Sequence, residues 1–207
     1  MNPLIRPYRR EDRDAVALVC TLTGDSGGDA TGKFADDALL PHIYALPYVD
    51  FAPGLASVVE IDGEVCGYVL GVADVAAFAR WWRSDWEPVL RSRFPGADTW
   101  PEADRSLFRR TVAGEDLWSP LRRDHPAEFH IDLLPKAQGL GLGRALIEGY
   151  CGKLRTLGVP AVAIGDGARN ANAVAFYTHL GFTVIGTQYS GDRPVGYTMG
   201  LDLGADV

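Results

Sequence analysis

A glycine-rich heptapeptide stands between a segment with strand character and a segment with helix character. Before it, Phe129, Ile131 and Leu133 alternate with other residues, as on one apolar face of a strand. After it, apolar residues recur at helical spacing over residues 142–157. A strand, a glycine-rich turn and a helix in this order predict an α/β fold with exposed backbone N–H groups at the helix start. The heptapeptide consists of Gln138, Gly139, Leu140, Gly141, Leu142, Gly143 and Arg144.

The alternation of strand and helix continues to the end of the chain. We expect a buried strand at residues 161–164, a helix at 172–180, and two final strands at 182–189 and 195–203. This β-α-β-α-β order implies that at least part of the sheet is parallel.

The N-terminal part predicts a mixed set of elements. They are an edge strand at residues 4–8, a helix opened by Asp12, an irregular glycine-rich loop at 24–32, a helix at 36–46 that ends before Pro47, and a hairpin at 58–72. Asp62 and Gly63 stand between the two arms of the hairpin and predict a type I′ turn, which requires positive φ angles.

Residues 74–127 differ in character from the rest of the chain. Phe78, Trp82, Trp86 and Leu90 follow helical spacing, and Pro101 is placed to open another helix. All five tryptophans fall in this segment. About 50 residues rarely bury enough surface to fold alone, so we expect one domain over residues 1–207 with a helical insertion at about 74–127.

The glycine-rich turn is suited to an anion such as a pyrophosphate. Glycines let the backbone approach phosphates, and the start of a helix presents N–H groups and the positive end of its dipole. A turn without any ligand is the simpler alternative. A dinucleotide-binding fold is another, although its pattern needs a glycine where Arg144 stands; Asp166 lies near the place of its acidic residue.

Two motifs resemble the GNAT acetyltransferase superfamily. The first is Leu133-Leu134-Pro135 followed by Gln138-x-x-Gly141-x-Gly143, similar to the acetyl-CoA motif. The second begins at Asn172 and continues through Phe176-Tyr177 to Gly181-Phe182. The resemblance covers about residues 3–73 and 128–203, and implies a mixed central sheet of about seven strands flanked by helices.

The tryptophan-rich insertion, the preceding segment 48–54 and the hairpin indicate a subfamily. These parts resemble bacterial acetyltransferases that are similar to the C-terminal acetyltransferase-like domain of O-GlcNAcase. The glycoside hydrolase half of O-GlcNAcase is not present, because a (β/α)₈ barrel alone needs roughly 250 residues.

The resemblance also implies roles for individual residues. Leu133 and Leu134 contact the pantetheine arm through their backbone, residues 138–144 hold the pyrophosphate, and Asn172 contacts the coenzyme or only caps its helix. Tyr177 is the general acid that protonates the leaving thiolate, with a packing role as the alternative. We expect Phe176 on the packing stripe of the helix and Tyr177 at its edge.

The acceptor amine must lose a proton, and one strand offers three side chains for this. Glu128, His130 and Asp132 alternate along it and therefore point to the same face. We rank Asp132 and His130 first as general base, although a polar row on a strand is also typical of a solvated face. The remaining histidines have no metal-type spacing, so we expect no metal.

These observations favour an acetyltransferase that moves the acetyl group of acetyl-CoA to an amine by direct transfer in a ternary complex. A catalytically silent acetyl-CoA-binding module and a dinucleotide-binding enzyme are the alternatives. The acceptor is a small molecule, an amino sugar or a protein lysine. The loop 24–32 and the tryptophans are expected to wall its pocket, unless the tryptophans pack the insertion or a homodimer interface.

Charge and cysteine content restrict the other partners. A net charge of −7 disfavours nucleic acid as a partner, and we find no apolar stretch long enough to span a membrane. Three cysteines form no disulfide framework, which favours a reducing compartment. We therefore expect a cytoplasmic protein.

Overall fold

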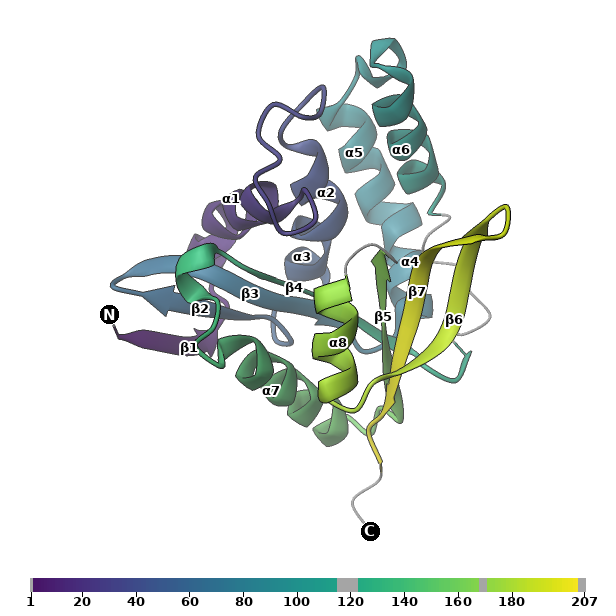
Figure 1. Cartoon of the computed structure of the whole chain (residues 1–207). Coiled ribbons are helices and arrows are strands. Elements are labelled where there is room, and N and C mark those ends of the chain that lie inside the picture. Colours follow the sequence, from purple (N-terminus) through teal and green to yellow (C-terminus); the bar gives the residue numbers. More distant parts are fainter. Residues whose placement is uncertain (1, 115–122, 168–170, 205–207) are drawn as a thin grey trace.

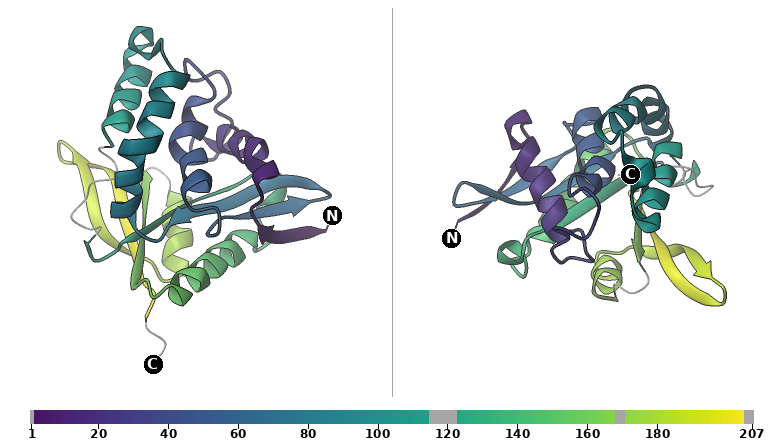
Figure 2. Two further views of the ribbon diagram at one scale, coloured as in Figure 1. Left: turned by 180° about the vertical axis from the view of Figure 1, so that it is seen from behind. Right: turned by 90° about the horizontal axis from the view of Figure 1, so that it is seen from above.

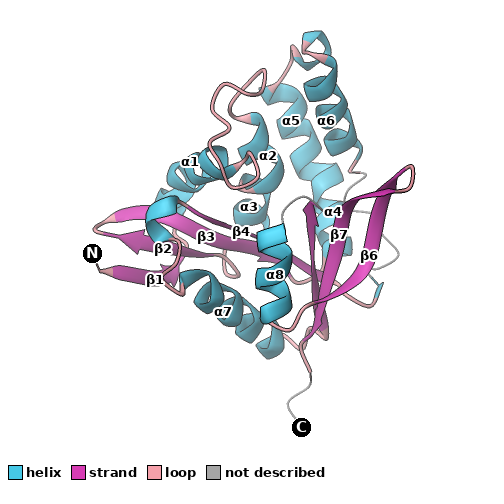
Figure 3. Cartoon of the chain, viewed as in Figure 1, coloured by secondary structure: helices cyan, strands magenta, loops and turns pink. Residues whose placement is uncertain are grey.

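A computed structural model describes residues 2–114, 123–167 and 171–204, with only the backbone given for residues 166, 167 and 171. Its centre is one seven-stranded sheet in the order β1-β2-β3-β4-β5-β7-β6, shown in magenta in Figure 3. The strands are β1 (Pro3–Pro7), β2 (Ser57–Ile61), β3 (Glu64–Val72), β4 (Ala127–Leu133), β5 (Ala161–Gly167), β6 (Thr183–Ser190) and β7 (Arg193–Asp202).

Helices cover both faces of this sheet (Figures 1 and 2). One face carries α1 to α6, and the other carries α7 and α8. The helices are α1 (Arg13–Thr23), α2 (Leu39–Tyr44), α3 (Leu46–Phe51), α4 (Val75–Trp81), α5 (Glu87–Arg93), α6 (Glu102–Ala113), α7 (Leu142–Thr156) and α8 (Ala171–His179). The mixed α/β fold expected from the sequence is therefore confirmed.

The β2–β3 hairpin divides its side chains between two hydrophobic cores. Val58 and Tyr68 face the core under α1 to α3, whereas Val59 and Val69 face the core under α7 and α8. This division follows from the period of two along a strand. The turn between the arms has φ angles of 52° at Asp62 and 85° at Gly63, so the predicted type I′ geometry is confirmed.

Two local predictions were wrong in the N-terminal part. The helix expected at 36–46 is two short helices, α2 and α3, with a break at Ala45 (φ −130°, ψ −62°). Pro47 does not end a helix but lies in the first turn of α3, where its missing N–H costs no hydrogen bond. Asp12 does not cap α1 with its side chain; its carboxylate instead accepts hydrogen bonds from the Arg6 guanidinium and the Arg9 N–H.

The described part of the insertion is helical, as predicted, and packs into the same hydrophobic core as α1 to α3. The Trp86 indole N–H donates to the His42 carbonyl of α2 at 3.0 Å. The Asp104 carboxylate of α6 accepts from the Ala35 N–H at 2.8 Å. Through these contacts the insertion supports α2 and the segment that leads into it.

Strands β4 and β5 form the parallel pair that the sequence predicts, but they pair at only two positions, Ala127 with Val162 and Glu128 with Ala163. Beyond these positions they diverge. The other strand pairs of the described sheet are antiparallel. This topology differs from the largely parallel sheet of a dinucleotide-binding fold, so that alternative is not supported.

Candidate functional site

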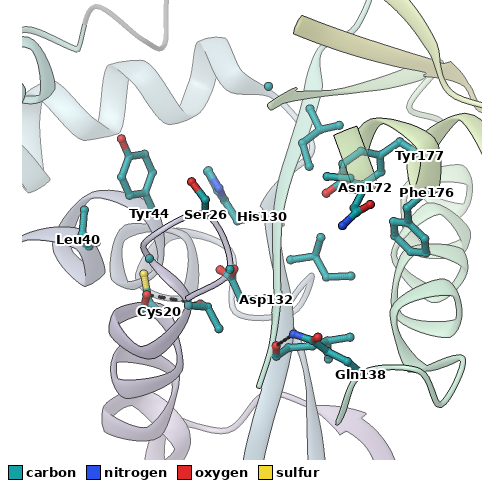
Figure 4. A pocket seen from close by; sticks show the side chains of 18 of the residues that line it. Cys20, Ser26, Leu40, Tyr44, His130, Asp132, Gln138, Asn172, Phe176 and Tyr177 are labelled. Carbon is teal, nitrogen blue, oxygen red and sulfur yellow. Dashed lines mark hydrogen bonds between the residues drawn. The ribbon is translucent and has the colours of Figure 1, made fainter. Parts of the chain in front are cut away.

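The divergence of β4 and β5 opens a pocket of about 820 Å³. Figure 4 shows its two walls: α1, α2 and the loop after α1 on one side, and α8 on the other. The end of β4 and the start of the glycine-rich turn run between these walls. The pocket brings together seven of the thirteen site residues proposed from the sequence, which are His130, Asp132, Leu133, Gln138, Gly139, Asn172 and Tyr177. Leu134 and residues 140–144 do not line it.

Glycine is required at the three positions of the turn for different structural reasons. Gly139 and Gly141 have φ angles of 72° and 76°, which only glycine adopts without strain. Gly143 instead lies close to α8, because a Cβ atom there would meet the Phe176 ring at 3.3 Å. Gly139 and Gly141 thus shape the turn, and Gly143 lets α7 and α8 approach each other.

Helix α7 begins at Leu142 with Gly141 as its N-cap residue, and no described side chain caps this end. The first-turn N–H groups and the helix dipole of a 15-residue helix therefore provide an anion-binding position. Arg144 is exposed and its guanidinium lies 3.3 Å from the Glu148 carboxylate, one turn along the helix. Leu140 is also exposed, whereas Leu142 is half-buried against the core.

Two backbone groups at the end of β4 form hydrogen bonds within the protein. The Leu133 carbonyl accepts a hydrogen bond from the Gln138 side-chain amide at 2.8 Å. The Leu134 N–H donates to the Cys66 carbonyl of β3 at 2.8 Å. Gln138 therefore ties the glycine-rich turn to the end of β4, and this contact orients the two parts of the site.

Helix α8 presents its side chains differently from the prediction. Tyr177 is only 6% exposed and packs against Phe129 and Phe182, whereas Phe176 is half-buried. The stripe is centred on Tyr177 because Ala173, Tyr177 and Leu180 are spaced i, i+4 and i+7. Both aromatic residues line the pocket.

The Asp132 side chain points from β4 toward α1 and α2, on the side of the pocket opposite α8 (Figure 4). Tyr68 is its partner across the β3–β4 register, and the Tyr68 hydroxyl donates to the carboxylate at 2.5 Å. Burial raises the pKa of Asp132 to about 6, although hydrogen bonds from Tyr68 and Thr23 act in the opposite direction. A carboxyl group of this pKa can exchange a proton near neutral pH.

Two other residues of the row, His130 and Glu128, precede Asp132 on β4 and share one hydrogen-bonding partner. The Tyr48 hydroxyl of α3 donates to the Glu128 carboxylate at 2.8 Å and lies 3.1 Å from His130 Nε2. The predicted alternation is therefore confirmed, but the row is not a solvated surface, since Glu128 is buried and His130 and Asp132 are half-buried. It faces α1 to α3.

Sequence reasoning missed the partners of this polar row. Tyr68, Tyr48 and Thr23 come from β3, α3 and α1, and only the tertiary structure brings them to β4. Tyr68 lies opposite Asp132 in the register of β3 and β4, but no turn sets this register in the sequence, because residues 73–126 separate the two strands.

Of the two predictions for the pocket walls, one is confirmed and one is wrong for the described residues. The loop after α1 contributes Gly24, Ser26 and Gly27, as predicted. None of the four described tryptophans lines the pocket; Trp82 and Trp86 are buried in the insertion. Trp118 lies outside the described residues, as does the side chain of Asp166.

Within residues 2–114, 123–167 and 171–204, no group of three or more His, Cys, Asp or Glu side chains is arranged to hold a metal ion. No helix in the same part has the length and apolar character needed to cross a membrane.

Known structures resemble the whole chain. The crystal structure of SsHAT is 34% identical, covers 99% of this chain and 100% of its own, and superposes with a TM-score of 0.87. The structure of yncA, a putative acetyltransferase from Salmonella typhimurium with its cofactor acetyl-CoA, is 19% identical with a TM-score of 0.59. It covers 99% of this chain and 95% of its own, and at this identity the likeness concerns the fold alone.

Relatives found by sequence match a smaller part of this chain. A mycothiol acetyltransferase of Paenarthrobacter aurescens is 36% identical over 95 residues, and one of Pseudarthrobacter chlorophenolicus is 40% identical over 67 residues. These matches cover 42% and 31% of this chain but only 29% and 21% of the relatives. The profile of the Acetyltransferase (GNAT) family matches residues 31–182, which is most of the chain. The chain therefore belongs to the GNAT family of acetyltransferases.

Proposed function

We propose that this protein transfers the acetyl group of acetyl-CoA to an amine in a ternary complex. One observation carries the proposal: the divergence of β4 and β5 places a carboxyl group of raised pKa and a tyrosine on opposite walls of one pocket, next to a glycine-rich helix start. Membership of the GNAT family and relatives named as acetyltransferases support it.

The coenzyme would occupy the glycine-rich side of the site. The N–H groups at residues 139–144 would bind its pyrophosphate, and the pantetheine would follow the β4 backbone beside Leu133 and Leu134. Gln138 would hold the turn in place through its bond to Leu133. Asn172 is exposed in the first turn of α8 and would contact the coenzyme arm from the other wall.

The reaction then needs two proton transfers. Asp132, as general base, takes a proton from the acceptor nitrogen, whose lone pair forms the new C–N bond at the thioester carbonyl. The C–S bond breaks as the tetrahedral intermediate collapses, and the Tyr177 hydroxyl gives its proton to the departing thiolate. His130 is the second candidate base, because it lines the same wall.

The insertion and segment 48–54 support a place among bacterial acetyltransferases similar to the O-GlcNAcase C-terminal domain. All three cysteines are buried and free, which supports a reducing compartment such as the cytoplasm. A catalytically silent module would share the glycine-rich turn, and it becomes the better description if acetyl-CoA binds but no amine is acetylated.

Gly141→Ala should weaken acetyl-CoA binding at least tenfold. The added methyl group strains a residue with positive φ and displaces the N–H groups that would face the pyrophosphate. Gly158→Ala is the matched control, because Gly158 has a φ of 71° at the other end of α7 and equally open surroundings. Calorimetry should show normal affinity for the control; equal affinity of both variants would reject the turn as the binding site.

Tyr177→Phe should reduce the rate of acetyl transfer by roughly 10²-fold while acetyl-CoA affinity changes little. The substitution keeps the ring contacts with Phe129 and Phe182 and removes only the hydroxyl. Release of coenzyme A thiol reports the rate. Tyr189→Phe on the exposed β6 strand controls for loss of a tyrosine hydroxyl in general. Wild-type turnover in Tyr177→Phe would assign this side chain to packing alone.

With an acceptor amine whose own pKa lies well below 6, so that its free-base fraction stays constant, the rate of acetyl transfer at low acceptor concentration should rise with pH through an apparent pKa near the value of about 6 for Asp132. The reason is that only the ionised carboxylate accepts a proton. Asp132→Asn should lose this rise and most of the rate. Tyr68→Phe should move the rise to higher pH, since it removes a hydrogen bond that stabilises the ionised form. A rise that survives in Asp132→Asn but disappears on substitution of His130 would make the imidazole the base.

A further inference from the structure

A two-residue turn forms the tip of the loop after α1. The Asp25 N–H donates to the Gly28 carbonyl at 2.9 Å, and the Gly28 N–H donates back to the Asp25 carbonyl at the same distance. The two residues between them, Ser26 and Gly27, have φ angles of 54° and 91°. Two hydrogen bonds around two residues of positive φ define a type I′ turn, like the turn between β2 and β3.

Contacts with α1 and α2 fix the position of this turn. The Gly27 N–H donates to the Thr23 carbonyl at the end of α1, at 2.9 Å. Gly24 packs directly on α2, because a Cβ atom there would collide with the Leu40 side chain. At the other end of the loop, the buried Ala30 donates its N–H to a further α1 carbonyl at 3.0 Å. The tip is therefore held in one place by backbone contacts.

Serine is an unusual residue for the first position of such a turn. Positive φ strains a residue that has a Cβ atom, and type I′ turns prefer glycine, asparagine or aspartate. The β2–β3 turn follows this preference with Asp62. Within the part of the chain that the structure describes, the Ser26 hydroxyl forms no hydrogen bond that would offset the strain. A strained residue without such a bond points to a function for its side chain.

The Ser26 side chain lines the pocket on the side opposite α8 (Figure 4). The same wall includes Leu40 and Tyr44 of α2. The glycine-rich turn and α8, which we propose for the coenzyme, lie across the pocket. A hydroxyl on the Ser26 side is therefore placed to meet the acceptor, and it can donate or accept a hydrogen bond.

We propose that Ser26 is a specificity-determining residue, whose hydroxyl forms a hydrogen bond with a polar group of the acceptor other than the reacting nitrogen. The type I′ turn presents this hydroxyl at a fixed place in the pocket. This inference rests on the proposed function and deepens it, because it gives the acceptor a second point of attachment on the side of the pocket that carries Asp132.

The test measures kcat/KM for glucosamine, spermidine, a lysine-containing peptide and cyclohexylamine at saturating acetyl-CoA. The first three amines carry polar groups besides the reacting nitrogen, and cyclohexylamine carries none. The informative quantity is the ratio of each polar amine to cyclohexylamine, compared between wild type and variant. Differences in the intrinsic reactivity of the amines cancel in this comparison.

Ser26→Ala should lower the ratio of the preferred polar amine about tenfold, because the acceptor loses one hydrogen bond. Ser26→Gly should lower it to the same extent. Its melting temperature should not fall, since glycine adopts positive φ without strain, so the loss cannot come from an unfolded loop. The KM for acetyl-CoA should stay at the wild-type value in both variants.

Asp62→Gly is the matched control. It changes the first residue of the β2–β3 turn, where φ is 52°, and this residue does not line the pocket. The ratio should therefore remain at the wild-type value.

Three outcomes would overturn the inference. Equal slowing of cyclohexylamine and the polar amine by Ser26→Ala would show a general effect of the loop on the reaction. A wild-type ratio in Ser26→Ala, or transfer to cyclohexylamine alone, would remove Ser26 from recognition while leaving the proposed function intact. Absence of transfer to all of these amines, although acetyl-CoA binds, would instead refute the proposed function and this inference with it.

Discussion

The divergence of β4 from β5 is the constraint on which the pocket depends. β3 pairs with β4 at six positions and β5 pairs with β7 at seven, whereas β4 and β5 share only two. The sheet therefore behaves as two halves joined at Ala127 and Glu128. Phe129, the first residue beyond the last pair, contacts the rings of Tyr150, Tyr177 and Phe182, and all four belong to the core under α7 and α8.

Each face of the sheet contributes a different half of the site. The core under α7 and α8 supports the glycine-rich turn and Tyr177, so it supports the side proposed for the coenzyme. The core under α1 to α3 supports Tyr48 and Tyr68, which orient the polar row of β4. The insertion packs into this second core and Trp86 donates to α2, so the described tryptophans support the wall that we propose for the acceptor without lining the pocket.

Features with local signals were predictable from the sequence. Asp62 and Gly63 specified their turn because few residues adopt positive φ, and the glycine-rich turn was readable because a strand and a helix flank it. The break at Ala45 was missed because a proline can either end a helix or begin the next one. The partners of Asp132 and His130 were not predictable, since Tyr68 and Tyr48 reach them only after three separate elements have packed.

A crystal structure of the protein with acetyl-CoA would test the central claim most directly. The account predicts pyrophosphate oxygens on the N–H groups of residues 139–144, pantetheine in the opening between β4 and β5, and the thioester carbonyl between Asp132 and Tyr177. A coenzyme bound elsewhere, or a β5 strand that closes onto β4 and fills the opening, would contradict it.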